Sequence, residues 1–299
     1  MNLTQLSVKV IALLSLSIGA VVMAGTPDGV SKKQLSGSQV QYTQSEIDNY
    51  YAAPDWFPDQ HPAMPKLVSH GDGGKVLACA SCHLTSGLGH PESANMAGQP
   101  QSYLVRQMRE YKTRARFEPS PMFQMASAMS EQDMQDVSAY FAALKPVQSS
   151  RVEEVDQVPQ TSIHPTLQMR QAVPNGVMEP INGRIIEIPA DPERVQMRDP
   201  SAGFVAYVPR GSVETGHSLV ADGGGKTLPC TGCHGDQLQG TPDLPRLAGL
   251  SPDYVLRQLQ AFKSGNRHGE QSVLMKPVID GLTPVEMVNI AAYVGTLKP

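Results

Sequence analysis

The sequence predicts an all-α fold made of two tandem helical domains, with long irregular segments at the N-terminus and between the domains. Three observations predict it. The length of 299 residues suits about two domains. The chain repeats itself at a spacing of 151 residues. Apolar residues in each copy recur at helical intervals, whereas the segment between the copies has no helical period.

The repeat is centred on two pentapeptides of the form Cys-x-x-Cys-His, at residues 79–83 and 230–234, which use all four cysteines of the chain. Residues 103–108 and 254–259 match at the same spacing of 151. Matching residues further along the two copies are 153 positions apart. A two-residue insertion therefore lies in the second copy, between about residues 263 and 275. The two halves are therefore copies of one structural unit.

The Cys-x-x-Cys-His spacing is the one used for covalent attachment of c-type haem. Two thiols one helical turn apart can add to the two vinyl groups of one porphyrin, and the next residue then supplies an imidazole to the iron. A thioredoxin-like dithiol or half of a zinc site are the alternatives. The sequence favours two covalently bound haem c groups, because His follows the second Cys in both copies. The predicted attachment residues are Cys79, Cys82, Cys230 and Cys233, and the predicted proximal ligands are His83 and His234.

The first residues have the pattern of a signal peptide. Lys9 precedes an apolar run from Val10 to Val22, and Ala24 ends a site suited to cleavage. The alternative is a retained membrane anchor, but a spanning helix needs about 20 apolar residues and this run is shorter. We expect cleavage after about Ala24, export to the periplasm, and no membrane insertion of the mature chain.

The overall charge argues against one class of partner. The chain has 24 Lys and Arg against 28 Asp and Glu, a net charge of −4, and loss of Lys9 with the signal peptide would leave 23 basic residues. Binding to nucleic acid needs a concentrated basic surface. No nucleic-acid partner is therefore expected.

The repeat and the composition divide the chain into five segments. We predict a signal peptide at 1–24, an N-terminal extension at 25–55, a first haem domain at 56–146, a Pro-rich linker or arm at 147–206 and a second haem domain at 207–299. A unit of under about 100 residues with few aromatic residues buries a thin core by itself. A haem inside each unit would supply the missing apolar mass.

Two helices are predicted in each haem domain. Apolar side chains at i, i+1, i+4 and i+7 predict one over about residues 103–112. Ser130, followed by acidic residues, predicts the start of the next. In the second copy Thr283 and Glu286 form a capping box, with Pro284 at the first helical position.

The segment from 147 to 206 holds seven prolines and is longer than an ordinary loop. Asn182-Gly183 predicts a turn, followed by one short strand at about residues 184–189. The segment is either a disordered linker or an arm packed across the haem domains, and we favour a partly ordered arm. The extension at 25–55 has the same pattern.

Methionines are the best candidates for the second axial position on each iron. Met122 lies eight residues before Ser130, and Met275 lies eight residues before Thr283. A thioether is a soft, neutral ligand that raises the haem potential relative to bis-imidazole ligation. Core packing is the commoner role of Met, and Met125 and Met129 are neighbouring rivals of Met122. The remaining histidines near the motifs are expected to be solvated: His70, His90, His217 and His268.

These features occur in the same order in both copies: the haem motif, Ala-Gly, a helix containing Tyr-x-x-Arg-Gln, Met, and a capped terminal helix. In this the chain resembles the class I cytochromes c, most closely the two-domain dihaem cytochrome c4 group, over about residues 66–146 and 217–299. The resemblance implies His/Met-ligated irons, with axial roles for His83, Met122, His234 and Met275. Leu84, where such proteins usually have Gly, and the long linker depart from the pattern.

The predicted function is electron transfer between redox proteins, with no catalytic residue. The expected partners are a dehydrogenase or quinol-oxidising complex on one side and an oxidase, a reductase or another cytochrome on the other. One alternative is a dihaem enzyme, such as a peroxidase or a thiosulfate dehydrogenase-like protein. Another is a haem subunit of a dehydrogenase complex, attached through the arm. No cysteine is spare and both copies offer Met, which favours the carrier.

Overall fold

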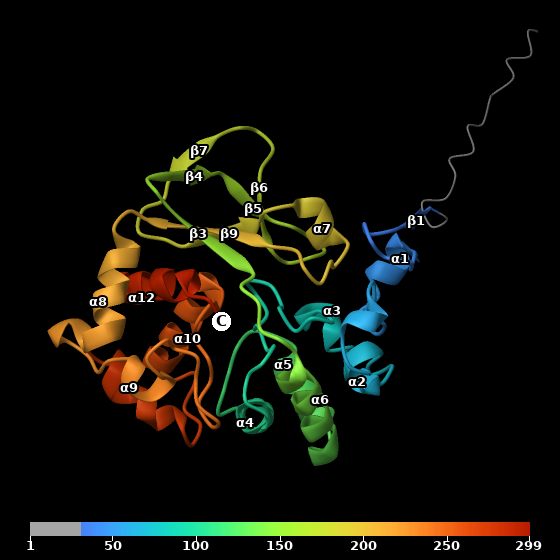
Figure 1. The fold of residues 1–299 in the computed structure, drawn as a ribbon, viewed down its shortest axis with the longest axis horizontal. Coiled ribbons are helices and arrows are strands. Elements are labelled where there is room, and N and C mark those ends of the chain that lie inside the picture. Colours follow the sequence, from blue (N-terminus) through green and yellow to red (C-terminus); the bar gives the residue numbers. More distant parts are fainter. Residues whose placement is uncertain (1–30) are drawn as a thin grey trace, which may run out of the picture.

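The computed structural model describes residues 31–299, which form two helical domains and a β-structured segment that lies against both (Figure 1). The predicted signal peptide and its cleavage site lie outside the described residues. Between residues 31 and 299 no helix is long and apolar enough to cross a membrane.

The first helical domain follows a short N-terminal arm. The arm contains β1 (Lys32–Lys33), β2 (Tyr42–Thr43), α1 (Gln44–Ile47) and the 3-10 turn η1 (Pro58–Gln60). The domain contains α2 (Lys66–Ser69), α3 (Ala80–His83), α4 (Gln101–Thr113), α5 (Met122–Ala128) and α6 (Glu131–Ala143). Its core lies between α4, α5 and α6 and is built largely from Met, Val and aromatic side chains.

The second helical domain repeats this arrangement. It contains α8 (Ser212–Asp222), the 3-10 turn η2 (Gly223–Gly225), α9 (Thr231–His234), α10 (Pro252–Ser264), the 3-10 turn η3 (Ser272–Met275), α11 (Lys276–Ile279) and α12 (Pro284–Thr296). The helices α8, α10 and α12 pack around its core. The two domains are therefore built from corresponding helices, as the repeat predicts.

The predicted helices and caps are confirmed. The hydroxyl of Ser130 accepts a hydrogen bond from the backbone N–H of Asp133, and the Asp133 carboxylate accepts one from the Ser130 backbone. Thr283 and Glu286 make the same reciprocal capping box at the start of α12. Each box satisfies backbone N–H groups that have no partner within the helix.

The prediction of an all-α fold with an irregular linker is wrong for the segment between the domains. This segment, here called the β module (residues 150–209), contains one helix and seven strands: β3 (Ser150–Val155), β4 (Gln157–Pro159), β5 (Thr161–Ile163), β6 (Arg170–Ala172), β7 (Met178–Pro180), β8 (Ile186–Pro189), α7 (Pro192–Gln196) and β9 (Phe204–Pro209). The order β3-β9-β8 forms one sheet, with β3 parallel and β8 antiparallel to β9. The boundary predicted after residue 206 falls inside β9.

The strands other than β8 escaped prediction because most are short, because several end in proline, and because β3 and β9 pair over more than fifty residues of sequence. Asn182 and Gly183 do form the predicted turn, both with positive φ (48° and 72°), and β8 follows it. Ile186 and Ile188 of β8 are both buried in a cluster with Val158. The module therefore has a small core of its own.

The β module contacts both helical domains. β3 packs against α12 and β8 against α10 in the second domain. On the other side the indole Nε1 of Trp56 donates to the carbonyl of Met197 over 2.8 Å, and the hydroxyl of Ser86 donates to the carbonyl of Pro200 over 2.6 Å. The interdomain segment is thus an ordered bridge, which agrees with an arm packed across the domains.

Candidate haem sites and the domain interface

The first Cys-x-x-Cys-His motif forms the short helix α3. The Nδ1 atom of His83 lies 2.9 Å from the carbonyl oxygen of Ala94 and donates to it, which leaves Nε2 as the nitrogen with a free lone pair. Burial lowers the pKa of His83, despite this hydrogen bond. A neutral imidazole with a fixed tautomer is the form that binds a metal ion.

The second motif has the same geometry. His234 Nδ1 lies 2.8 Å from the carbonyl oxygen of Pro245, again eleven residues further along the chain. Burial lowers the pKa of this imidazole too. Each half of the molecule therefore presents one Nε2 atom in the same local setting.

The four cysteines form no disulfide with one another. Before haem is attached, burial raises the pKa of the Cys79 thiol to about 12 and that of the Cys230 thiol to about 11. Between residues 31 and 299 no group of three or more His, Cys, Asp and Glu side chains could hold a metal ion. The two Cys pairs thus do not combine into the four-cysteine site that zinc would use.

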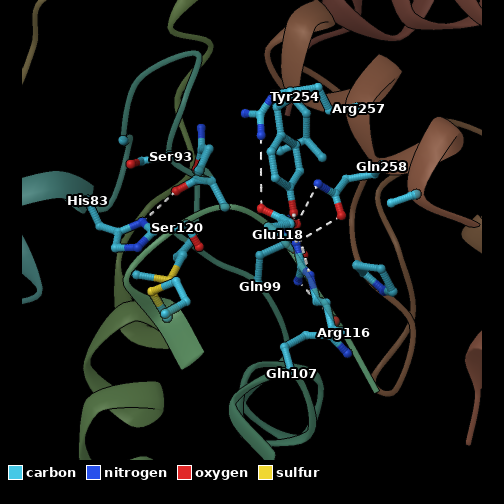
Figure 2. Close-up of a pocket in the computed structure, with 18 of the residues that line it drawn as sticks. His83, Ser93, Gln99, Gln107, Arg116, Glu118, Ser120, Tyr254, Arg257 and Gln258 are labelled. Carbon is cyan, nitrogen blue, oxygen red and sulfur yellow. Dashed lines mark hydrogen bonds and ion pairs between the residues drawn. The ribbon is translucent and has the colours of Figure 1, made fainter. Parts of the chain in front are cut away.

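Residues of both motifs line one continuous cavity of about 1320 Å³. Figure 2 shows His83 at this cavity, with Tyr254 and Gln258 of the second domain. Its walls include Leu104, Val137 and Phe141 from the first domain and Leu259 and Ile290 from the second. Porphyrins are large apolar groups, and a cavity with apolar walls beside each thiol pair and imidazole suits one in each half. The residues present therefore fit two haems.

The predicted methionine ligands also line this cavity. Met122 begins α5, and Met275 ends η3 directly before α11, so both stand where a new helix starts. Both side chains are half-buried. Met125 and Met129 line the cavity as well, but they are buried in the core of the first domain.

Leu84, which follows the first motif, adopts an unusual backbone conformation. Its φ and ψ are 62° and 161°, close to the 83° and 157° of Gly235 after the second motif. This region is used almost only by glycine and costs another residue of order 1–3 kcal/mol. The sequence departs from the family pattern at Leu84, but the chain keeps the glycine conformation.

His90 lines the cavity and is partly exposed, and no interaction marks it as an iron ligand. Burial against the cavity wall lowers its pKa to about 3. Its Nδ1 atom accepts a hydrogen bond from the backbone N–H of Glu92 over 3.2 Å. No sequence signal distinguished it, because Thr241 occupies the matching position of the other copy.

The two domains meet around a pair of buried arginines, Arg116 and Arg267, whose backbones pair across the interface. Each guanidinium bonds the glutamine of its own domain and that of the other: Arg116 reaches Gln107 (3.0 Å) and Gln258 (2.8 Å), and Arg267 reaches Gln258 (3.0 Å) and Gln107 (2.8 Å). The contacts follow an approximate two-fold symmetry, which fixes one domain against the other.

One carboxylate breaks this symmetry. Glu118 accepts hydrogen bonds from Arg116 (2.8 Å) and from the amide of Gln258 (2.9 Å) (Figure 2). Burial opposes its ionisation, but Arg116 and these hydrogen bonds outweigh burial and lower its pKa to about 2. Gly269 stands at the matching position of the second copy, and no carboxylate is bonded to Arg267 within the described chain.

The surroundings of the two motifs differ. At the first, the carbonyl of Tyr50 from the N-terminal arm accepts hydrogen bonds from Ala78 and Ser81, and Arg198 from the β module lies over the Tyr50 ring. At the second, Cys233 is exposed and lines the cavity together with Leu228 and Leu274. Val273, the neighbour of Leu274, is 63% exposed.

Each half of the chain has a Cys-x-x-Cys-His motif with a buried imidazole beside an apolar cavity wall. These features define a two-domain c-type haem protein. The family model described as cytochrome c matches residues 72–145 and 214–298, which together make up more than half of the chain. The chain belongs to the cytochrome c family. It carries two covalently bound haem c groups, one for each motif.

Similar proteins match either most of this chain or one part of it. Cytochrome c4 of Azotobacter vinelandii is 27% identical over 236 residues, which cover 74% of this chain and 85% of the relative. Cytochrome c-554(547) of Halothiobacillus neapolitanus is 41% identical over 85 residues, 25% of this chain and 93% of that protein. The structure of thiosulfate dehydrogenase from Marichromatium purpuratum has a TM-score of 0.53 and 28% identity, and covers 76% of this chain but only 38% of that one.

Proposed function

We propose that this cytochrome is an electron carrier in which both irons are closed by the protein on both faces. The observation that carries the proposal is the equivalence of the two sites: each half offers one neutral imidazole and one methionine at the start of a helix, beside the same cavity. A haem with two protein ligands supplies one-electron exchange and leaves no position for a substrate.

The site residues follow from this arrangement. Cys79 and Cys82 would hold haem 1, and Cys230 and Cys233 would hold haem 2. The axial pairs would be His83 with Met122 and His234 with Met275. Met122 is a better candidate than Met125, because Met122 shares its half-buried position at a helix start with Met275.

We also propose the domain division and location that the sequence suggests. The haem domains would span residues 56–146 and 207–299, with the signal peptide removed after about Ala24 and the mature chain in the periplasm. The family-model matches at 72–145 and 214–298 lie within these two domains and support the division.

Haem 2 is the proposed point of exchange with redox partners. Val273 and Val285 are each 63% exposed, and Leu274, next to Val273, lines the haem cavity together with Leu228. The charges around them form pairs, Lys226 with Glu286 and Lys276 with Asp280. At the positions of Val273, Leu274 and Val285 the first copy has Ser120, Pro121 and Gln132. The N-terminal arm and the β module cover the haem motif of the first copy. A partner with an uncharged apolar docking face, carried by a dehydrogenase, an oxidase or another cytochrome, fits this patch.

An optical and mass measurement tests the carrier against the enzyme. We expect two porphyrins per mature chain, and a ferric spectrum whose methionine-to-iron charge-transfer band corresponds to both haems. The likeness to a thiosulfate dehydrogenase favours a dihaem enzyme as the second candidate. A high-spin signal from one haem, together with thiosulfate or peroxide turnover, would support that enzyme and overturn the carrier.

Stopped-flow kinetics test the docking patch. The probe is a blue-copper protein with an uncharged docking face. We expect its rate with the native cytochrome to change less than about threefold between low and high salt, because the paired charges leave little net field. Val273→Lys should lower the rate about tenfold. Ile163→Lys, at a 50% exposed position of β5, is the control and should leave it unchanged. Equal rates for the two variants would contradict this docking site.

A further inference from the structure

Glu187 is a fully buried carboxyl group, only 4% exposed, in β8 of the β module. It accepts hydrogen bonds from the hydroxyls of Ser150 and Ser251, the latter over 2.7 Å, and from the backbone N–H of Asp253 over 3.1 Å. All three donors are neutral. Among the described residues no Lys, Arg or His forms an ion pair with Glu187.

Two opposing effects act on the charge of this carboxyl group. Burial without a cation disfavours the carboxylate. The three donors and the N-terminus of α10, a helix of thirteen residues, favour it. Burial is the larger effect and raises the pKa of Glu187 to about 7. Both charge states of this buried group are therefore accessible near neutral pH.

Few other charged groups lie on the elements packed around Glu187. β6 packs against β8 and contributes Arg170, whose guanidinium donates to the hydroxyl of Thr161 over 2.8 Å. β9 has Ala206 at the paired position. β3 contributes Ser150, and the adjacent Arg151 is exposed and paired with Glu153. α10 contributes Asp253, whose carboxylate bonds Arg257 over 3.1 Å and whose charge also raises the pKa of Glu187.

Glu187 is linked to the haem 2 side of the cavity through α10. The hydroxyl of Ser251 donates to Glu187 and also accepts from the backbone N–H of Tyr254, so the carboxyl group orients the N-cap of this helix. Tyr254, Val255 and Leu259 of α10 line the cavity. The matching N-cap in the first domain is Pro100, which makes no side-chain cap. The connection therefore exists in the second domain only.

We propose that Glu187 is a positioning residue that couples proton uptake to the reduction of haem 2. The inference goes beyond the carrier function and rests on the assignment of haem 2 to the second domain. When a redox partner donates one electron to haem 2, the lower positive charge there would favour the protonated carboxyl group of Glu187. When the electron passes on to the next partner, Glu187 would return its proton to solvent. The potential of haem 2 consequently falls as the pH rises through neutrality, whereas that of haem 1 does not respond to Glu187.

Spectroelectrochemical titration of the holoprotein between pH 5 and 9 tests this coupling, with the two haems assigned by NMR of their methyl groups. We expect proton binding at Glu187 to be threefold to tenfold weaker when haem 2 is ferric, tenfold corresponding to ~59 mV. Glu187→Gln keeps the shape but cannot ionise, and should abolish the pH dependence of haem 2 at neutral pH. Glu214→Gln, which removes an exposed carboxyl group in the same domain, should preserve it.

Haem 1 serves as a control inside the same molecule. An unchanged pH dependence of haem 2 in Glu187→Gln would overturn the proposal, as would an equal loss at both haems. If Glu187→Gln does not fold, infrared difference spectra of the native protein at pH 7 answer the question: a protonated carboxyl band should grow on reduction, and its absence overturns the coupling. A native protein whose optical spectrum lacks the methionine-to-iron band would instead contradict the carrier function, which is a different outcome from failure of the coupling.

Discussion

The two haem domains come from one repeated sequence, yet their surroundings differ. The first motif lies under the N-terminal arm and the β module, with Tyr50 and Arg198 beside it. The second contains the exposed Cys233, and the exposed side chains of Val273 and Val285 lie in the same domain. The imidazole geometry is the same in both. The added segments, and not the repeated helices, account for the contacts that only the first motif makes.

The largest expected effect comes from removing one haem at a time. Cys230→Ser with Cys233→Ser should halve the covalently bound haem, measured by the pyridine haemochrome assay, and stop exchange with the blue-copper probe. Cys79→Ser with Cys82→Ser should halve the haem but preserve that exchange, because haem 2 remains. The reverse pattern would show that haem 1 is the site of exchange.

The next effect tests the two interface arginines. Arg116→Met leaves Glu118 with only the more distant Arg257, 3.9 Å away, as a cation, and should lower the free energy of unfolding by about 3 kcal/mol. Arg267→Met leaves only neutral acceptors unpaired, so we expect a loss of about 1–3 kcal/mol. Denaturant unfolding at equal haem content measures both. Equal losses of unfolding free energy in the two variants would show that the carboxylate of Glu118 does not add to the cost of removing Arg116.

A smaller effect should appear in acid. The pKa of Glu118 is about 2 in the folded chain against 4.5 for an ordinary Glu. Because its folded pKa is lowered, the stabilisation is complete above about pH 4.5 and is lost as the pH falls towards 2. Thermal unfolding between pH 2 and 6 should show this slope, and Glu118→Gln should flatten it. Glu193→Gln, at an exposed position in α7, is the control.

The smallest effect concerns the residue after each motif. Gly235→Ala should lower the free energy of unfolding by about 1–3 kcal/mol, because its positive φ strains any other residue. The added Cβ meets no atom closer than 3.5 Å, so the cost is in the backbone. Leu84→Gly relieves the same strain but loses a buried side chain worth about 1.5–3 kcal/mol. We expect little net change there, and calorimetry of the two variants checks the contrast.

The sequence predicted what depends on local chemistry and on the repeat. The two motifs, the capping boxes at Ser130 and Thr283 and the helical stripes are encoded within a few residues. The turn at Asn182-Gly183 and the strand after it were predicted for the same reason. Comparing the copies also located the candidate methionines.

The sequence did not predict features that depend on distant contacts. β3 and β9 pair over more than fifty residues, and neither has an alternating pattern that identifies a strand. The arginine network joins residues of both domains and has no local signal. Likewise, Glu187 is surrounded by charged and apolar residues in sequence, and only the packing of β8 on α10 shows that it is buried.

The parallel pairing of β3 and β9 has a consequence for the order of assembly. β3 begins a few residues after the first domain ends, and β9 leads directly into the second, so this ladder brings the ends of two separately folding units together. Closing that loop costs chain entropy and slows the step relative to helix formation within either unit. Pairing of β3 with β9, and with it the docking of the two units, is therefore expected to follow helix formation within each unit.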